Sequence, residues 1–230
     1  MPLGKFSELM FRMDSKQHQT FSSPECANEA NNIATPKEDC YQYFYLFGDL
    51  EPFFCRHLLD PHPVGVDPRI LHLGAIDSAI SVDLARIGYQ NQICVDFSTK
   101  VVERMWSRHV AKELGMEWNC LDMRNLNEIP TQSIDVAFDK GTMDAMIEST
   151  TREPELGVKH NISQYIREIS RVLKDDGTFL CITYTRPRLV QPLFSDSGLW
   201  EVQMEKLRGG ETVAECFGFA LTKKLNGSAG

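Results

Sequence analysis

The stretch from Arg69 to Ser98 constrains the fold of this chain more than any other part of the sequence. It reads as a short apolar strand, a tight turn, a helix that stops at Gly88, and a second strand that closes on Asp96. This order is typical of a Rossmann-type unit, in which the first turn contacts a nucleotide and the acid binds a ribose. Asp96 follows Gly74 by 22 residues, close to the usual spacing of about 20. The segment therefore predicts a nucleotide site.

The turn of this unit departs from the glycine-rich pattern GxGxxG. With Gly74 as the first glycine, Ile76 occupies the second glycine position and Ala79 the third. A β-branched residue is sterically disfavoured at a positive φ, and its side chain blocks close approach of a ligand to the backbone. We expect either a different path for the turn or weaker cofactor binding. Ser78 either offers a hydroxyl to the ligand or caps the following helix.

The bulk composition limits the class of protein. A chain of 230 residues with 42% hydrophobic content suits one domain, alone or with an arm. We expect neither a membrane span nor a secretory signal, because no long apolar run is present. Seven scattered cysteines without CxxC predict reduced thiols, a cytoplasmic or nuclear location and no metal site. The net charge of −8 disfavours nucleic acid as a partner and is compatible with a basic protein substrate; the oligomeric state is left open.

The chain divides into three expected parts. Residues 1–40 are polar and read as an N-terminal arm, poorly ordered or covering the substrate; residues 41–224 form the main domain and residues 225–230 a tail. The domain opens with an aromatic-rich helix from about Cys40 to Leu59. Further strands are expected at 70–73, 92–95, 116–120, 134–138 and 178–184, with helices at 78–87, 98–114 and 162–173. Two late strands without a long helix between them predict an antiparallel edge hairpin. The predicted fold class is α/β, a mostly parallel seven-stranded sheet with one antiparallel strand near its edge.

Three acids follow the ends of predicted strands. Asp96 closes the second strand, Asp122 follows the third, and Asp139 ends the fourth. The carboxyl ends of parallel strands share one rim, where ligands bind. Each acid alone is more often a cap or turn residue, but together they suit ribose hydroxyls, an adenine amino group and a cationic sulfonium better than phosphate. The pattern therefore favours S-adenosylmethionine (SAM) over NAD or ATP, and the absence of GxxxxGK[ST] excludes a P-loop.

The segment from Asp139 to Ala145, DKGTMDA, resembles the DKGTLDA signature of a eukaryotic methyltransferase-like family. Several members of that family methylate lysines of translation elongation factor 1A. Four further family motifs, GCGNSxLS, DM, VLxxGGxxLCI and FAFxxTK, resemble GAIDSAIS at 74–81, DM at 122–123, VLKDDGTFLCI at 172–182 and FGFALTK at 217–223. The resemblance covers about residues 41–224. It implies a class I SAM-dependent methyltransferase with a Rossmann-like fold.

The candidate site residues combine the strand-end argument with this resemblance. The candidate cofactor-binding residues are Leu73, Gly74, Ala75, Ser78, Asp96, Phe97, Asp122, Met123 and Asp139. The candidate catalytic residues are Asp139 and Tyr184. Asp139 either positions the acceptor amine or holds the ammonium group of the cofactor, and Tyr184 either lines the acceptor channel or is an ordinary tyrosine.

Three functions remain open at this point. The first is methyl transfer from SAM to a protein side chain, with lysine as the expected acceptor. The second keeps the cofactor but uses a small-molecule acceptor, because one fold serves many substrates. The third is a binding or scaffold protein that has lost catalysis, which Ile76 in place of glycine favours.

Overall fold

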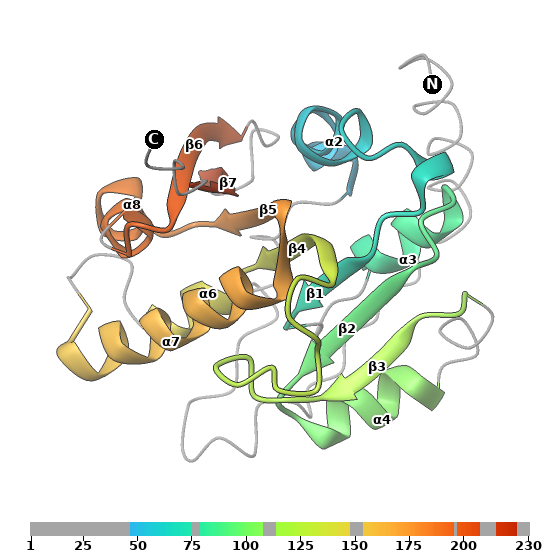
Figure 1. Ribbon diagram of the computed structural model, residues 1–230, viewed down its shortest axis with the longest axis horizontal. Helices are drawn as coiled ribbons and strands as arrows, with labels where there is room; N and C mark the ends of the chain where they lie inside the picture. Colours follow the sequence, from blue (N-terminus) through green and yellow to red (C-terminus); the bar gives the residue numbers. More distant parts are fainter. Residues whose placement is uncertain are drawn as a thin grey trace, which may run out of the picture.

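The computed structural model describes residues 47–74, 79–107, 114–147, 154–195, 197–207 and 215–224 (Figure 1). The predicted arm at 1–40 and tail at 225–230 lie outside the described residues, so both stay predictions. No helix in these ranges is long and apolar enough to cross a membrane.

The strands form one seven-stranded sheet in the order β3-β2-β1-β4-β5-β7-β6. Their bounds are β1 Ile70–Leu73, β2 Gln92–Asp96, β3 Glu117–Cys120, β4 Ile134–Lys140, β5 Leu173–Thr183, β6 Trp200–Leu207 and β7 Cys216–Lys223. The first five strands pair in parallel, whereas β7 is antiparallel to both of its neighbours. The predicted α/β class, with one reversed strand near an edge, is confirmed.

Helices cover both faces of the sheet (Figure 1). Their bounds are α2 Phe47–Phe54, η3 Cys55–Leu59, η4 Val64–Val66, α3 Ala79–Arg86, α4 Thr99–Ser107, α6 Thr142–Ile147, α7 Leu156–Val172 and α8 Pro187–Ser195. The predicted aromatic-rich helix is observed from Phe47 and ends in a wider π-helical turn, η3, where the Asp60 N–H donates to the Cys55 carbonyl at 3.0 Å.

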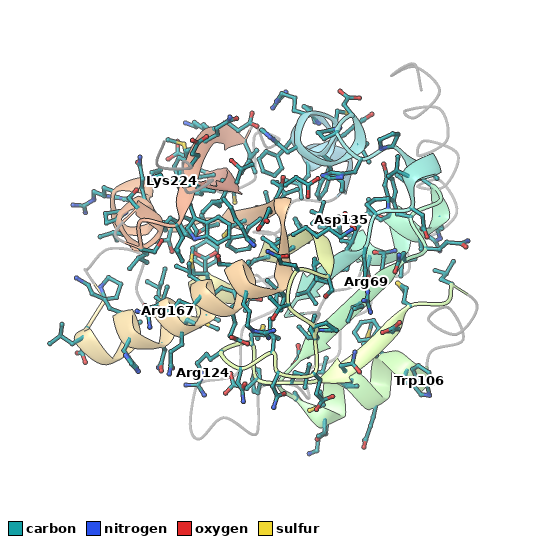
Figure 2. The ribbon with its side chains drawn as sticks, in the orientation of Figure 1. Arg69, Trp106, Arg124, Asp135, Arg167 and Lys224 are labelled. Atoms are coloured by element: carbon teal, nitrogen blue, oxygen red, sulfur yellow. The ribbon has the colours of Figure 1, made fainter. Side chains whose placement is uncertain are left out.

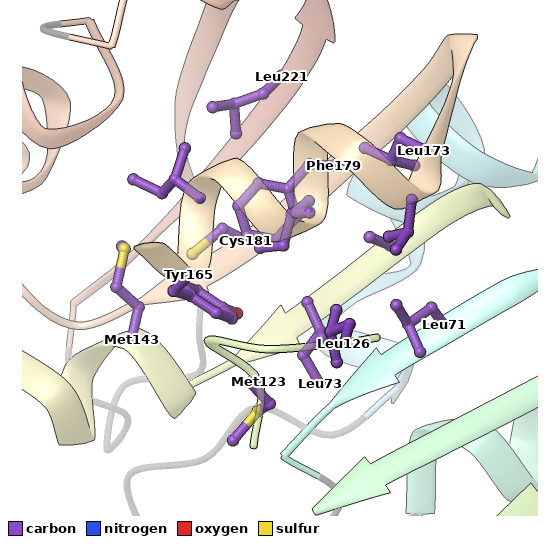
Figure 3. Close-up of a cluster of buried hydrophobic side chains, with 14 of the residues drawn as sticks. Leu71, Leu73, Met123, Leu126, Met143, Tyr165, Leu173, Phe179, Cys181 and Leu221 are labelled. Atoms are coloured by element: carbon purple, nitrogen blue, oxygen red, sulfur yellow. The ribbon is translucent and has the colours of Figure 1, made fainter. Parts of the chain in front are cut away.

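Alternating side chains of the strands supply two separate cores. On one face, Leu71 and Leu73 of β1 pack with Tyr165 and Ile166 of α7, in the cluster that Figure 3 shows. On the other face, Ile70 joins a cluster with residues of α2 and α3. Strands buried on both faces are what a parallel sheet between two helical layers requires.

Strand β4 is longer than the sequence predicts. The predicted strand ends at Phe138, whereas the observed one continues to Lys140. The extension follows from its central position, because Asp139 is in register with Leu73 of β1 on one side and Cys181 of β5 on the other. Asp139 therefore lies inside the sheet, one residue before the end of β4. The predicted helix at 162–173 ends at Val172 in the structure, and β5 begins at the next residue, Leu173, five residues before the predicted strand at 178–184.

Candidate functional site

The strand order reverses between β1 and β4, which makes this pair the topological switch point of the sheet. Leu73 is in register with Val95 of β2 and with Asp139 of β4, so the carboxyl ends of the three strands are level. Open α/β sheets bind ligands in the crevice outside these ends. The candidate residues at 73–74, 96–97 and 139 all come from this rim.

Gly74 and Thr142 meet at the switch point. Gly74 adopts φ +76°, and its N–H donates to the Val95 carbonyl at 2.9 Å. The Thr142 hydroxyl donates to the Leu73 carbonyl at 2.8 Å, and a Cβ on Gly74 would lie 1.9 Å from that hydroxyl oxygen. Glycine is therefore required both by conformation and by space. Ala75, Ile76, Asp77 and Ser78 lie outside the described residues, so the roles predicted for them stay predictions.

Asp96 and Phe97 form the β2 side of the rim. Asp96 is buried, and its Oδ1 accepts the Ser98 N–H at 2.9 Å, which fixes the turn after the strand. Phe97, the next residue, is 70% exposed. An acid beside an exposed aromatic ring suits a nucleoside, because the carboxylate accepts ribose hydroxyls and the ring offers an apolar face to a base.

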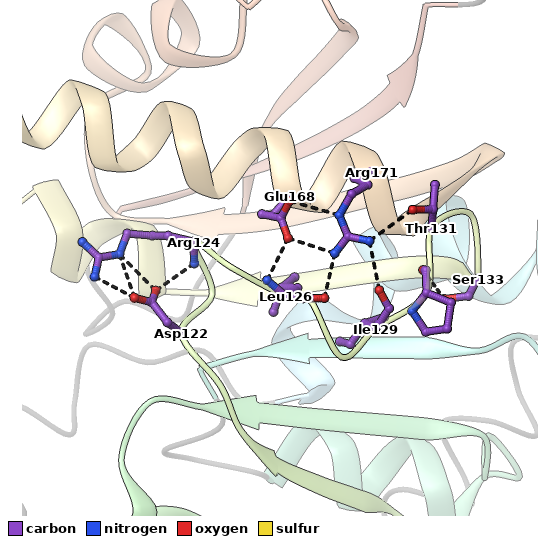
Figure 4. Close-up of polar contacts among 9 residues, drawn as sticks. Asp122, Arg124, Leu126, Ile129, Thr131, Ser133, Glu168 and Arg171 are labelled. Carbon is purple, nitrogen blue, oxygen red and sulfur yellow. Dashed lines mark hydrogen bonds and ion pairs between the residues drawn. The ribbon is translucent and has the colours of Figure 1, made fainter.

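Asp122, after β3, is already engaged by Arg124 (Figure 4). The Arg124 guanidinium donates to both carboxylate oxygens, from Nε to Oδ1 at 3.0 Å and from Nη2 to Oδ2 at 2.7 Å. These hydrogen bonds hold the pKa of Asp122 below its usual value. Arg124 also donates to Asn161 of α7 at 3.1 Å. The Met123 side chain is buried in the core, so a ligand at this point of the rim would meet its main chain.

The Asp139 carboxyl is fully buried and points toward α6 and α7. Its oxygens accept the Thr142 N–H at 2.8 Å, the Met143 N–H at 3.1 Å and the Tyr165 hydroxyl at 2.7 Å. Burial raises its pKa to about 7, although all three hydrogen bonds favour the charged form. In this arrangement Asp139 stabilises the start of α6 by accepting the N–H groups of its first turn. Its predicted contact with an acceptor amine or a cofactor stays a prediction.

Tyr184 follows β5 and is 39% exposed. Its main chain is held by Asp144, a buried acid on α6. Burial is the main cause that raises the pKa of Tyr184, and the Asp144 charge adds to it. Asp144 lies within the DKGTMDA segment, but the sequence predicted no role for it. Tyr165 and Arg124 were also missed; the Tyr165 contact with Asp139 and the Arg124 contact with Asn161 join residues that are distant in sequence.

Among the described residues, no group of three or more His, Cys, Asp or Glu side chains could hold a metal ion. The side chains at the rim fit SAM instead. Two acids follow adjacent strands, a glycine at positive φ opens the switch point, and an exposed aromatic ring stands beside the buried acid. Sheet order and rim chemistry together are those of the Rossmann-like fold of SAM-dependent methyltransferases.

Comparison with known proteins agrees with this class. Residues 71–181 match the family described as "Methyltransferase domain". It is 38% identical over 147 residues to EEF1A lysine methyltransferase 4 of Mus musculus, covering 61% of this chain and 54% of that protein. It is 29% identical over 167 residues to the mouse eEF1A lysine and N-terminal methyltransferase, covering 67% and 23%. The chain thus spans about half the length, or less, of these relatives.

Solved structures share the fold at low sequence identity. A protein from Pyrococcus horikoshii OT3 has a TM-score of 0.57 at 16% identity, covering 77% of this chain and 89% of that one. The N-methyltransferase NodS from Bradyrhizobium japonicum WM9 has a TM-score of 0.52 at 12% identity, covering 77% and 96%. These likenesses establish the architecture and say nothing of the acceptor.

Proposed function

We propose that this protein transfers a methyl group from SAM to lysine side chains of a protein substrate, with elongation factor 1A as the first candidate. Its similarity to EEF1A lysine methyltransferase 4 and to the eEF1A lysine and N-terminal methyltransferase supports this choice of acceptor. The observation that carries the proposal is the position of the DKGTMDA segment. Its Thr142 contacts Gly74 at the switch point, and its Asp144 holds the turn that carries Tyr184.

The chain has to align two reactants and deliver a neutral amine. SAM, when bound, supplies the methyl group on a sulfonium, and displacement there depends mainly on alignment. Asp96 and the backbone at Gly74 are the groups that we expect to hold the cofactor. A lysine amine has an ordinary pKa of about 10.4, and desolvation lowers it. The ring of Tyr184, a residue that is 39% exposed, offers an apolar wall for that desolvation.

Asp139 takes an indirect role in this proposal. Its carboxyl is enclosed by Thr142, Met143 and Tyr165 and has no exposed surface. We therefore assign it to fixing the start of α6, which carries both Thr142 and Asp144. Direct contact with the acceptor amine would require this enclosure to open.

Radiolabelled methyl transfer tests the proposal. The full chain is incubated with methyl-labelled SAM and either a eukaryotic cell lysate or purified elongation factor 1A, and labelled protein is hydrolysed to identify the methylated amino acid. We expect label in methyl-lysine of the elongation factor, and none with an Asp96→Ala variant. Label that enters only small molecules would favour the small-molecule acceptor. Absence of calorimetric binding at millimolar SAM would overturn both enzymatic functions and favour a scaffold.

We also propose a cytoplasmic location, with a nuclear one as the alternative, because an elongation factor acts in the cytoplasm. The free cysteines among the described residues are consistent with a reducing compartment. Fractionation of cells that express the full chain tests the location.

A further inference from the structure

The turn after β5 is held by hydrogen bonds to a single buried carboxylate. Asp144 of α6 is 4% exposed, and its Oδ1 accepts the hydroxyls of Thr183 and Thr185, both at 2.5 Å. The same oxygen accepts the Thr185 N–H at 3.2 Å, while Oδ2 accepts the Tyr184 N–H at 3.4 Å. Three consecutive residues therefore donate to one buried acid. Such an acid is costly to bury, so these bonds are what keeps it in place.

The residue between the two threonines is the one that reaches solvent. Thr183 and Thr185 are buried, whereas Tyr184 is 39% exposed. The hydroxyls of Thr183 and Thr185 fix the main chain on both sides of Tyr184. The fixed main chain in turn sets the direction in which the Tyr184 ring leaves the sheet.

The same short helix links this turn to the cofactor side of the rim. Thr142, the first residue of α6, donates to the Leu73 carbonyl beside Gly74. Before it, the Gly141 N–H donates to the Ile182 carbonyl of β5 at 3.1 Å. Helix α6 therefore contacts the switch point at its start and the Tyr184 turn through Asp144. A displacement of either contact changes the spacing between the two.

We propose that Asp144 is a positioning residue that sets the Tyr184 ring against the incoming acceptor side chain at the distance that the bound cofactor requires. This inference rests on the proposed function. It gives the second acid of DKGTMDA a role distinct from that of Asp139, which faces α7 and Tyr165. Asp144 itself touches neither reactant.

Two isosteric substitutions loosen the turn by different routes. In Asp144→Asn, the side-chain oxygen can keep both threonine hydroxyls, but the amide nitrogen replaces the acceptor of the Tyr184 N–H. In Thr185→Val the carboxylate is intact and one hydroxyl donor is lost, and Thr185→Ser restores that donor. Asp135→Asn is the matched control, because Asp135 lies with Arg69 at the amino ends of β4 and β1, remote from the rim (Figure 2).

The readouts separate positioning from general structural damage. We expect Asp144→Asn and Thr185→Val to lower kcat/KM for the protein acceptor by about 10- to 100-fold, as misplacement on the order of 1 Å does. The calorimetric Kd for SAM should stay within about twofold, and Thr185→Ser should recover most of the activity. In the protein without ligand, hydrogen exchange at the Tyr184 and Thr185 amides should accelerate in both loosened variants and not in Asp135→Asn.

A double-mutant cycle with Tyr184→Ala decides whether Asp144 acts through the ring. If it does, Asp144→Asn costs little more activity once the ring is absent, and the two losses fall well short of additive. Fully additive losses, or an equal loss of SAM affinity, would overturn the positioning role while leaving the proposed function intact. If the unaltered protein transfers no methyl group to any protein, the proposed function fails first and the positioning role fails with it. Where Asp144→Asn does not fold, Thr185→Val carries the same cycle.

Discussion

At the scale of single residues, His72 of β1 is a buried ionisable group on the face of the sheet opposite α7. Its Nε2 lies 2.6 Å from the Gln92 Oε1, and the Gln92 amide nitrogen donates to the carbonyls of Ser81 and Tyr89. Since that nitrogen is the donor, the Gln92 oxygen accepts, and the hydrogen of a neutral His72 lies on Nε2. Burial lowers the pKa of His72 from 6.5 to about 4.

The depressed pKa of His72 predicts a pH-dependent stability. The unfolded chain binds a proton at His72 below pH 6.5, whereas the folded chain binds one only near pH 4. The contribution of neutral His72 to the free energy of unfolding is therefore complete above pH 6.5 and is lost as the pH falls from 6.5 to about 4. When the pH falls from about 7.5 to about 5, protonation of His72 should lower the free energy of unfolding of the unaltered protein by about 2 kcal/mol. We expect this part of the drop to be absent in His72→Leu. Urea unfolding at both pH values measures this. Exposed His160→Leu is the control; equal pH slopes in all three proteins would refute the assignment.

Gly74 carries a second prediction at this scale, with a matched control in the same chain. Gly74 and Gly115 both have positive φ, +76° and +69°. A Cβ would meet the Thr142 hydroxyl at position 74 and nothing within 4 Å at position 115. We expect Gly115→Ala to cost about 1 kcal/mol of unfolding free energy, and Gly74→Ala about 2 to 4 kcal/mol because the clash adds to the strain. Equal losses in urea unfolding would show that Thr142 can move aside freely.

At the scale of elements, α7 holds the loop between β3 and β4 (Figure 4). Arg171 donates to the carbonyls of Leu126 at 2.7 Å and Ile129 at 3.0 Å, and Glu168 accepts the Leu126 N–H at 2.8 Å. Arg124 adds its bond to Asn161 nearer the start of the helix. The rim segment with Asp122 thus depends on a helix that also supplies Tyr165 to Asp139.

Removing the forked Arg171 guanidinium should therefore loosen the loop between β3 and β4. We expect Arg171→Ala to cost about 2 to 3 kcal/mol of unfolding free energy and to accelerate hydrogen exchange in residues 124–131, because the fork serves two carbonyls and a carboxylate. Arg171→Lys should recover only part, since an ammonium lacks the planar fork. Lys206→Ala, which removes an exposed ion pair with Glu215, should cost less than about 1 kcal/mol. An Arg171→Ala loss as small as that of Lys206→Ala would contradict the role.

Periodicity predicted most elements because their packing is regular. The apolar stripe at Ile162, Tyr165, Ile166, Ile169 and Val172 is the buried face of α7 as expected. The length of β4 could not be predicted, since Asp139 joins the sheet only because strands pair with it on both sides. The same limit applies to the site. Acids at strand ends share a rim by topology, whereas Asp144 and Thr185 meet across 41 residues, a contact that the sequence pattern does not contain.

At the scale of the whole molecule, protein side chains pack both faces of the sheet, whereas the expected cofactor residues lie at its carboxyl rim. Both large core clusters consist of side chains from strands, helices and the loops that connect them. The fold should therefore persist without SAM, and binding should add to its stability by mass action. This separates the cofactor site from the scaffold and makes ligand-dependent stability a clean measure of the site.

Thermal unfolding with and without SAM tests this separation. With SAM at about 100 times its Kd we expect a gain of about 2.7 kcal/mol, which for a chain of this size raises Tm by about 5 to 10 °C. Asp96→Ala should keep the far-UV circular dichroism of the unaltered protein and lose most of the shift, because the ribose acceptor is gone. Asp135→Asn, at the amino end of β4 and remote from the carboxyl rim, should keep the shift. An undiminished Tm shift in Asp96→Ala would show that the ribose does not bind at Asp96, and the position of the cofactor could then not be inferred from the fold alone.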